Sequence, residues 1–267
     1  MQVRPKLVSL DATGTLFRVR GSVGEAYARA AEAFGVHGLR PASLTRGFFA
    51  AWRDHNVRHP NFGHGTELSS YNWWSSLFGA TLAHARPELS HSEEFAADVF
   101  PKLFDQVWHD FTRAEAWEVF PETEPVIKTL RSNGIKVAVV SNFDERLPLL
   151  LKNLGLDHLF DVVLPSCYAG VAKPDPDIFY QALRKANVEG SEAVHVGDDY
   201  KKDYRGAKDA GLSRAFLMCR DAVALEKAAQ VPPADILHNL SDLLPALGLQ
   251  GPTLAQLSQC QGKAKRV

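Results

Sequence analysis

Short apolar runs alternate along most of the chain with stretches in which apolar residues recur every three or four positions. The runs cover residues 6–10, 137–140, 161–164, 193–196 and 214–217, and each has the length of a buried strand. Helical patterns lie between them at residues 122–132, 147–154, 177–186 and 204–210. This alternation predicts an α/β fold in which helices cover both faces of a mostly parallel, Rossmann-like sheet.

Residues 18–119 interrupt the alternation. Helical patterns cover residues 22–34, 44–54, 69–82 and 93–111, and no good strand pattern is found among them. Ser22 is the expected N-cap of the first helix, and Glu25 completes a capping box. We therefore predict a helical cap domain, 18–119, inserted into a core formed by residues 1–17 and 120–250. The polar residues 251–267 are expected to form a flexible tail.

The composition is that of an ordinary soluble domain, with 45% hydrophobic and 23% charged residues. The formal net charge of -1 gives no overall field that would attract nucleic acid. The sequence contains no apolar stretch of about 18 residues, the length that would predict a membrane-spanning helix. Three widely spaced cysteines without a CxxC pair favour a reducing compartment. We expect an intracellular, most simply cytoplasmic, protein. A mitochondrial or nuclear location and the oligomeric state stay open.

Carboxylates follow two of the predicted strands. Asp11 ends the first strand, and Gly14 allows a sharp turn just beyond it. Asp198, Asp199 and Asp203 follow the strand at 193–196. A rigidly held carboxylate can attack phosphorus when cations neutralise the phosphate, and clustered carboxylates favour Mg²⁺. Taken alone, each motif is equally compatible with an ordinary turn or a capped helix.

Two other loops carry groups that suit an anionic ligand. Ser141 and Asn142 follow the strand at 137–140 and can donate hydrogen bonds to a phosphoryl oxygen, although both are also common N-caps. Lys173 precedes Pro174, which favours an extended backbone, and its ammonium could neutralise both Asp11 and a phosphate. Because parallel strands share one carboxyl edge, we expect these groups to converge there. Together they are the components of phosphoryl transfer.

These four motifs, in this order, resemble those of the haloacid dehalogenase-like hydrolase superfamily, and the helical insert resembles its C1-capped subgroup. The resemblance implies that Asp11 is the nucleophile and that Ser141 and Lys173 are catalytic residues that hold the phosphoryl group. It implies substrate contacts from the loop residues Thr13, Gly14, Thr15 and Asn142. It implies a Mg²⁺ cofactor bound by Asp11, the Thr13 carbonyl, Asp198 and Asp203, with Asp199 as an alternative to Asp203.

Thr13 departs from the pattern of the family's phosphatases. They usually have a second aspartate at this position, which protonates the leaving group and then activates water. A threonine hydroxyl has no useful pKa near neutrality, so it cannot replace that carboxyl group. We therefore expect a Mg²⁺-dependent phosphatase-like hydrolase that acts slowly on a small phosphorylated metabolite through an aspartyl-phosphate.

Two alternatives stay open. A metal-free 2-haloacid dehalogenase also uses an aspartate nucleophile and lacks the second aspartate, but it has no need of the acidic residues Asp198 and Asp199. A non-catalytic binding or regulatory protein on the same fold would also account for Thr13. The presence of Asp11, Lys173 and Asp198 argues against that second alternative.

Overall fold

The computed structural model describes residues 4–250, which fold into two compact units. The first unit contains the residues up to 18, residues 119–142 and the residues from 155 on; the second contains residues 19–118 and 143–154. The limits of the predicted insertion lie within one residue of this division. The segment 143–154, which the sequence pattern assigns to the core, groups with the second unit instead. The predicted tail, 251–267, lies outside the described residues.

Six strands form the sheet of the first unit, and all neighbouring pairs run parallel. In spatial order they are β5 (Val162–Pro165), β4 (Lys136–Ser141), β1 (Leu7–Leu10), β6 (Ala193–Gly197), β7 (Arg214–Met218) and β8 (Ile236–Leu237). The five predicted strands and the α/β class are confirmed, and β8 is an additional edge strand. The order reverses at β1, and ligands of such sheets bind beyond the carboxyl ends of the strands at this reversal.

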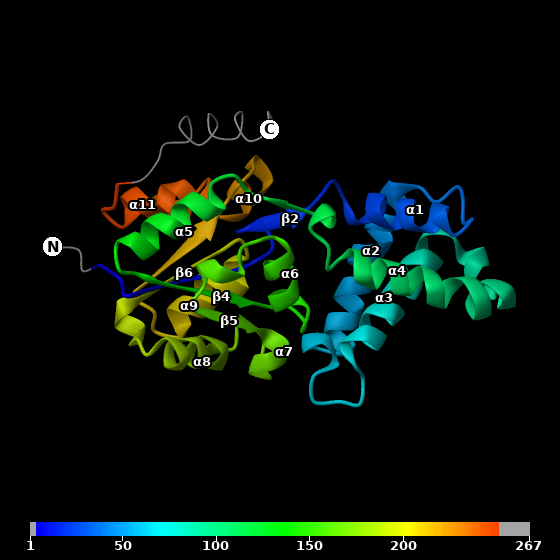
Figure 1. Ribbon diagram of the computed structural model, residues 1–267, viewed down its shortest axis with the longest axis horizontal. Coiled ribbons are helices and arrows are strands. Elements are labelled where there is room, and N and C mark those ends of the chain that lie inside the picture. The colour runs from blue at the N-terminus through cyan, green and yellow to red at the C-terminus, as the bar shows by residue number, and fades with distance from the viewer. Residues whose placement is uncertain (1–3, 251–267) are drawn as a thin grey trace. The chain divides into compact units, whose positions relative to one another are not determined.

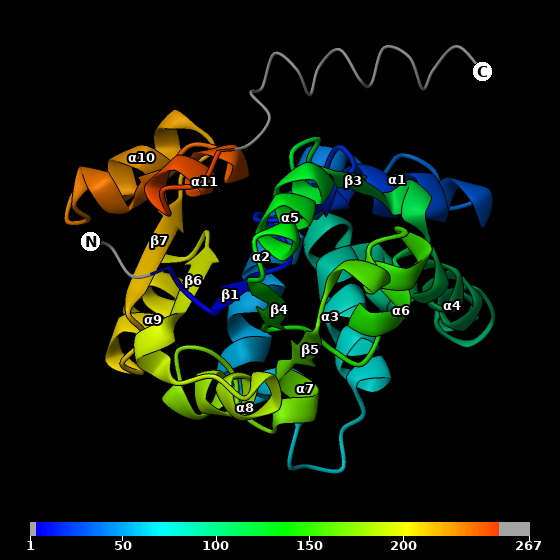
Figure 2. The ribbon, with the colours of Figure 1, turned by 60° about the vertical axis from the view of Figure 1, so that its left-hand side comes forward.

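Helices cover both faces of this sheet. Figures 1 and 2 show α5 (Thr123–Ser132) and α11 (Leu243–Ala246) on one face, with α8 (Pro176–Ala186) and α9 (Gly206–Asp209) on the other. Leu7 and Val140 pack with Phe179 of α8 in one buried cluster. Full burial of each such side chain stabilises the fold by about 1.5–3 kcal/mol. The sheet is therefore held from both sides, and its strand ends are fixed.

The sequence of α8 explains its limits. The side chain of Asp175, its N-cap, accepts a hydrogen bond from the backbone N–H of Asp177. Pro176 occupies the first turn, where its missing N–H breaks no intrahelical bond. The helix ends at Asn187, whose φ of 52° is left-handed. Its buried face consists of Ile178, Phe179, Ala182, Leu183 and Ala186.

Shorter helical segments complete the chain. The first unit also contains α7 (Ser166–Ala169) and α10 (Ala222–Lys227). The predicted helix at 204–210 begins earlier, with a π-helical turn, η7 (Tyr200–Arg205), which Asp199 caps through the N–H groups of Lys201 and Lys202. The other π turn is η3 (Phe95–Val99), and the 3-10 turns are η1 (Asn61–Gly63), η2 (Pro87–His91), η4 (Ala114–Ala116), η5 (Asp157–Leu159), η6 (Gly190–Glu192), η8 (Pro233–Asp235) and η9 (Leu240–Asp242).

The second unit is built mainly of helices, as predicted. They are α1 (Val23–Ala33), α2 (Pro41–Arg58), α3 (Ser70–Ala85), α4 (Phe100–Asp110) and α6 (Leu147–Asn153). Ser22 and Glu25 form the predicted capping box of α1. The expectation of no strand between 18 and 119 is wrong, because β2 (Phe17–Val19) pairs with β3 (Trp117–Val119). Strands of three residues are too short for their alternation to be visible in the sequence.

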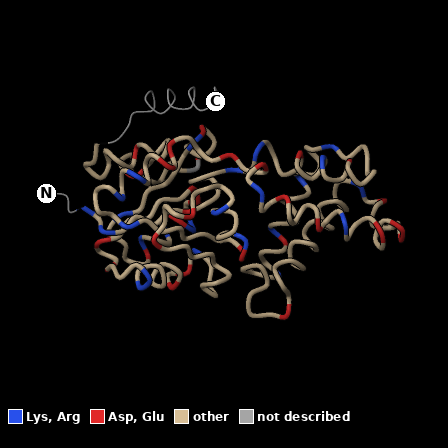
Figure 3. The backbone as a smooth tube through the Cα atoms, in the orientation of Figure 1, with Lys and Arg blue, Asp and Glu red and all other residues tan. Residues whose placement is uncertain are grey.

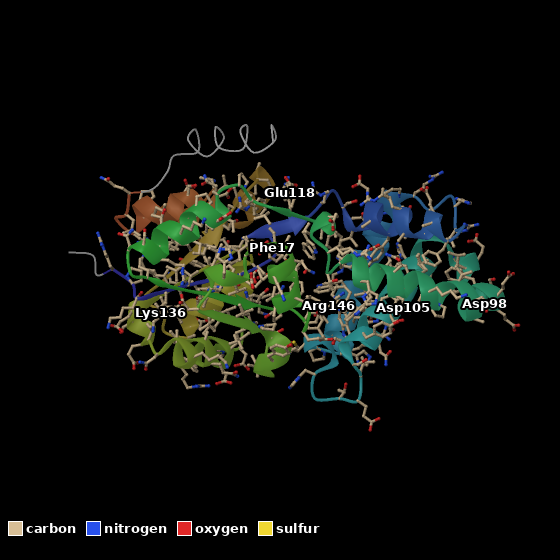
Figure 4. All side chains as sticks on the ribbon, in the orientation of Figure 1. Phe17, Asp98, Asp105, Glu118, Lys136 and Arg146 are labelled. Carbon is tan, nitrogen blue, oxygen red and sulfur yellow. The ribbon has the colours of Figure 1, made fainter. Side chains whose placement is uncertain are left out.

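Polar contacts explain why residues 143–154 belong to the second unit. The buried carboxylate of Asp144 accepts a hydrogen bond from the indole N–H of Trp74 at 2.8 Å and one from Arg146 at 2.7 Å. The guanidinium of Arg146, labelled in Figure 4, stacks 3.5 Å from the ring centroid of Trp108. These contacts tie the segment to α3 and α4.

Charged residues of both signs are interspersed along the backbone of each unit, as Figure 3 shows, in agreement with the near-neutral net charge. Within residues 4–250, no helix combines the length and the apolar character needed to cross a bilayer.

Two neighbouring aromatic residues of α8 test this packing. Phe179 is 1% exposed and Tyr180 is 40% exposed. We expect Phe179→Ala to lower the free energy of unfolding by about 3–5 kcal/mol, because it removes a ring from the core. Tyr180→Ala should cost about 1 kcal/mol or less. Urea unfolding monitored by circular dichroism measures both, and equal losses would contradict the assigned core.

Candidate active site

Asp11 lies directly after β1, at the point where the strand order reverses. Its backbone N–H donates a hydrogen bond to the carbonyl of Val196 in β6 at 2.8 Å, so the sheet hydrogen bonding extends to this residue. Its side chain is buried, with 8% of the residue exposed. The predicted nucleophile is therefore presented by the central strand and not by a mobile loop.

A tight loop follows Asp11. The carbonyl of Ala12 accepts backbone hydrogen bonds from Thr15, Leu16 and Phe17 at 3.3, 2.8 and 3.3 Å. Gly14 has a φ of +85°, a left-handed conformation that favours glycine, and a Cβ there would overlap the carboxylate of Asp198. Gly14 is required on both counts.

The two threonines of this loop have opposite environments. Thr13 is exposed, whereas Thr15 is fully buried. The Thr15 hydroxyl has no hydrogen-bond partner within the described part of the chain. The predicted substrate contact through the Thr15 side chain would thus need a group to reach a buried oxygen, while the Thr13 side chain is accessible.

Lys173 brings the predicted motifs together. Its ammonium donates to Asp11 at 2.6 Å, to Asp203 at 2.5 Å and to the Val140 carbonyl at 2.8 Å, and the residue is 3% exposed. Asn142 holds the lysine in place, because its side-chain amide donates to the Lys173 carbonyl at 2.9 Å and accepts from the Lys173 N–H at 2.7 Å. Asn142 thus contacts the backbone of the cationic residue, and its predicted contact with substrate stays a prediction.

Ser141 ends β4 beside the nucleophile. It is buried, and its side chain lies near enough to the Asp11 carboxylate to lower the pKa of that group slightly, which favours its charged form. This places the predicted phosphate-binding hydroxyl beside Asp11.

Asp203 is committed to several partners. One oxygen accepts from Lys173 and lies 3.1 Å from Nε2 of His195, and the other accepts from the backbone N–H of Asp199 at 3.0 Å. Nδ1 of His195 lies 2.8 Å from the hydroxyl of Ser9. Because a carboxylate only accepts, this network assigns the Nε2–H tautomer to neutral His195. The single hydrogen of the Ser9 hydroxyl then lies between Nδ1 and the Val194 carbonyl, which is 3.2 Å from the hydroxyl oxygen.

His195 is a core histidine, and both of its ring nitrogens have hydrogen-bond partners. It is fully buried, and burial lowers its pKa although the Asp203 carboxylate opposes the shift. The sequence did not indicate that its partner would be Asp203. The period-two alternation of β6 places position 195 on the face opposite Val194 and Val196, which was the available signal.

The charges of the site control one another. Burial alone would lower the pKa of Lys173, but the carboxylates of Asp11 and Asp203 outweigh it and raise that pKa above its usual value. Burial alone would raise the pKa of Asp203, but Lys173 and then the hydrogen bond with His195 hold it well below the usual range. Burial also raises the pKa of Asp11, against the opposing charge of Lys173. Lys173 is therefore charged, and Asp203 is its permanent counter-ion.

Asp198 brings a third carboxyl group to the site, and the single positive charge of Lys173 cannot balance three ionised carboxylates. The residue as a whole is exposed, yet desolvation of its carboxyl group and the nearby charges of Asp11 and Asp203 raise its pKa to about 8. Oxygens of Asp11, Asp198 and Asp203 all lie within 4.8 Å of one another. An all-oxygen set with excess negative charge fits a hard divalent cation such as Mg²⁺. Of the two residues left open by the sequence, Asp203 belongs to this group, whereas Asp199 caps η7.

Arg220 and Glu122 are further residues of this edge that the sequence analysis missed. Arg220 donates to the carbonyls of Gly14 and Thr15 at 2.9 and 2.8 Å and to Glu122 at 2.7 Å. Arg220 follows the end of β7 by two positions, so its place at a strand end was the one available signal.

Comparison with known proteins agrees with this geometry. The family described as "Hydrolase: haloacid dehalogenase-like hydrolase" matches residues 5–211. Haloacid dehalogenase-like hydrolase domain-containing protein 3 of Homo sapiens is 37% identical over 254 residues, which cover 95% of this chain and 97% of the human one. These matches confirm the resemblance that the motifs indicated.

Solved structures show the same fold. A 2-haloacid dehalogenase from Pseudomonas syringae superposes with a TM-score of 0.61 at 27% identity, covering 91% of this chain and 98% of the other. A HAD phosphatase from Thermococcus onnurineus superposes with a TM-score of 0.58 at 23% identity, covering 92% and 100% of the two chains. The second likeness concerns the fold alone.

Replacing the shared cation tests the electrostatics of the site. Lys173→Met leaves the buried carboxylates of Asp11 and Asp203 uncompensated, and we expect it to lower the free energy of unfolding by about 3–5 kcal/mol near neutral pH. In the wild type the pKa of Asp203 is depressed, so its stabilisation is present above about pH 4 and is lost below it. In the variant these carboxyls should protonate as the pH falls toward about 5, which relieves the repulsion.

The difference in stability between wild type and Lys173→Met should therefore shrink as the pH falls from about 7 to about 5. Denaturant unfolding at several pH values measures it, with Lys201→Met, at an exposed lysine, as the control. A pH-independent difference would show that the lysine is not the counter-ion of these carboxylates.

Proposed function

The chain belongs to the haloacid dehalogenase-like hydrolase family, and on that premise we propose that it is a Mg²⁺-dependent phosphatase-like hydrolase with Asp11 as nucleophile. The observation that carries this proposal is the convergence of Lys173 with the carboxylates of Asp11, Asp198 and Asp203. Phosphoryl transfer needs a positioned nucleophile together with cations that neutralise the phosphate oxygens. The carboxyl edge of the sheet brings together a nucleophile and groups that can supply these cations.

Asp11 acts first in the proposed reaction. One of its carboxylate oxygens attacks phosphorus, the bond from phosphorus to the ester oxygen breaks, and the alcohol leaves after taking a proton from solvent. Ser141, which ends β4 beside Asp11, donates a hydrogen bond to a phosphoryl oxygen. The ammonium of Lys173 balances the charge of the transferred group. Water then attacks the aspartyl-phosphate, which releases inorganic phosphate and restores the Asp11 carboxylate.

The cation would be held by Asp11, Asp198 and the Thr13 carbonyl, with Asp203 beside them. When bound, Mg²⁺ neutralises phosphate charge and orients the phosphoryl group. Asp203 contributes chiefly by holding Lys173, because Lys173, His195 and the Asp199 N–H already contact its oxygens.

Thr13 makes the second half of the reaction slow. Its exposed side chain lies where the family's phosphatases carry their acid–base aspartate, and a hydroxyl does not exchange protons usefully near neutral pH. General acid–base catalysis is typically worth about 10²–10⁴-fold in rate. The aspartyl-phosphate should therefore persist longer than in an enzyme with two aspartates.

The proposed substrate is a small phosphorylated metabolite. The near-neutral net charge supports neither a nucleic acid nor an anionic membrane as the partner. We propose an intracellular location, because the sequence has only three cysteines and they are widely spaced.

A metal-free dehalogenase is the second candidate, and the 27% identity to a 2-haloacid dehalogenase favours it. That reaction also needs an aspartate nucleophile, and it would account for the threonine at position 13. The cluster of three carboxyl groups weighs against it, because their mutual repulsion raises the pKa of Asp198, and a bound cation relieves that repulsion whereas a halocarboxylate, itself an anion, adds to it. The charge of the site thus favours a cation over a haloacid.

A screen of phosphorylated metabolites and p-nitrophenyl phosphate, with wild type beside Asp11→Asn, tests the proposal. We expect phosphate release that requires millimolar Mg²⁺, stops in EDTA and is abolished in Asp11→Asn, because the amide is not a nucleophile. Release of halide from 2-haloacids in EDTA would identify a dehalogenase. Absence of turnover, with no Mg²⁺-dependent binding of beryllofluoride, would identify a non-catalytic protein.

The role of Thr13 has its own test. Thr13→Asp should raise the turnover of p-nitrophenyl phosphate by about tenfold or more, because it restores a titratable carboxyl group. Thr13→Asn, similar in size but not ionisable, is the matched control and should give no gain. Thermal unfolding of both variants checks that they fold, and equal rates for the two would contradict the assigned role.

A further inference from the structure

Arg220 binds the loop that follows the nucleophile through several contacts at once. Its Nε donates to the Gly14 carbonyl at 2.9 Å, and one terminal nitrogen donates to the Thr15 carbonyl at 2.8 Å. The other terminal nitrogen donates to Glu122 at 2.7 Å, and the guanidinium lies 3.4 Å from the ring centroid of Phe120. All three guanidinium nitrogens are thus used, and one face of the group is stacked.

This arrangement depends on the shape of arginine. A planar guanidinium can address two consecutive carbonyls and a carboxylate in fixed directions, whereas an ammonium is a point charge on a flexible stem. The carboxylate is itself enclosed, because the side chain of Glu122 is 3% exposed, and it also accepts from the backbone N–H of Leu240 at 3.4 Å. An ion pair this enclosed holds its geometry firmly, since losing one partner leaves an uncompensated buried charge.

The clamped carbonyl is next to a metal-binding carboxylate. Gly14 packs so closely on Asp198 that a Cβ would overlap its carboxyl group. Any rotation of the peptide between Gly14 and Thr15 would therefore change the space available to Asp198. By holding the Gly14 carbonyl, Arg220 keeps the space around the Asp198 carboxyl group constant.

The same loop orients the carbonyl of Thr13. The Gly14 N–H donates to the Phe17 carbonyl at 2.8 Å. In a trans peptide the C=O points opposite to the N–H, so the Thr13 carbonyl is directed away from Phe17. Because the Ala12 carbonyl accepts hydrogen bonds from three further N–H groups, the loop is held together as one unit, and it begins one residue after Asp11.

We propose that Arg220 is a positioning residue for cation binding: it locks the loop after Asp11 so that the Thr13 carbonyl and the Asp198 carboxylate are held ready for the ion. This inference rests on the proposed function. It assigns a role to a side chain that lies outside the four motifs and that approaches the site from the end of β7.

Isothermal titration of Mg²⁺ in the presence of beryllofluoride tests the inference on the full chain. Outer groups that orient ligands are typically worth about 10–100-fold in metal affinity. Arg220→Met and Arg220→Lys should both weaken Mg²⁺ binding by about tenfold or more. Lysine keeps the positive charge but lacks the planar guanidinium that reaches two carbonyls at once. If Arg220→Lys binds Mg²⁺ as weakly as Arg220→Met, the geometry of the arginine side chain matters and not its charge alone.

Arg214 is a matched control at the other end of the same strand. It donates to the Ala246 carbonyl at 3.0 Å, lies 3.4 Å from Asp235, and stacks 4.3 Å from the ring of Phe216. Arg214→Met removes contacts of the same kind without touching the nucleophile loop. It should lower the melting temperature and leave Mg²⁺ binding unchanged, whereas the Arg220 variants should lose binding even at temperatures where they remain folded.

The outcomes separate the two proposals. Wild-type affinity in the Arg220 variants, or an equal loss in Arg214→Met, would overturn the positioning role and leave the proposed function standing. No binding of Mg²⁺ and beryllofluoride by the wild type itself would overturn the proposed function, and the positioning role with it.

Discussion

The ammonium of Lys173, shared between the buried carboxylates of Asp11 and Asp203, is the interaction on which the site depends. Moving ions out of water costs several kcal/mol each, and their attraction offsets this cost only when the geometry is fixed. Here the backbone supplies that geometry. Asn142 holds the Lys173 peptide, the Asp11 N–H joins the sheet, and the Asp199 N–H holds Asp203. Displacing any of these segments would leave a buried charge without its partner.

The topology of the sheet makes this geometry possible. β1 lies between β4 and β6, so the strand that leads to Asp11 is flanked by β4, which ends at Ser141, and by β6, which Asp198 follows directly. Four segments that are far apart in the chain reach one edge with short loops. The rigidity of the site is thus a property of the parallel sheet, whose strands are buried and whose helices pack on both faces.

The features that could be predicted from the sequence are those that depend on residues close together in the chain. The five long apolar strands, the capping box of α1 and the strand-end positions of Asp11 and Asp198 all follow from periodicity and turn chemistry. The two- and three-residue strands carry no readable period. The helix at 147–154 was visible, but its membership of the second unit depends on Asp144 meeting Trp74, a contact 70 residues apart. Ser9, which contacts His195, and Gly14 and Glu122, which contact Arg220, likewise come from segments far away in the chain, where local pattern carries no information.

The threonine at position 13 does not take part in the side-chain contacts that hold the site together. The side-chain contacts that assemble the site come from Lys173, Asp203, His195 and Arg220. The Thr13 side chain is exposed, and the residue contributes to the loop through its backbone, which forms a β-bridge with Phe17. A change of side chain there can alter how protons move while leaving the nucleophile and the cation-binding carboxylates in place. Loss of the acid–base carboxyl group therefore argues for slower turnover and not for collapse of the site.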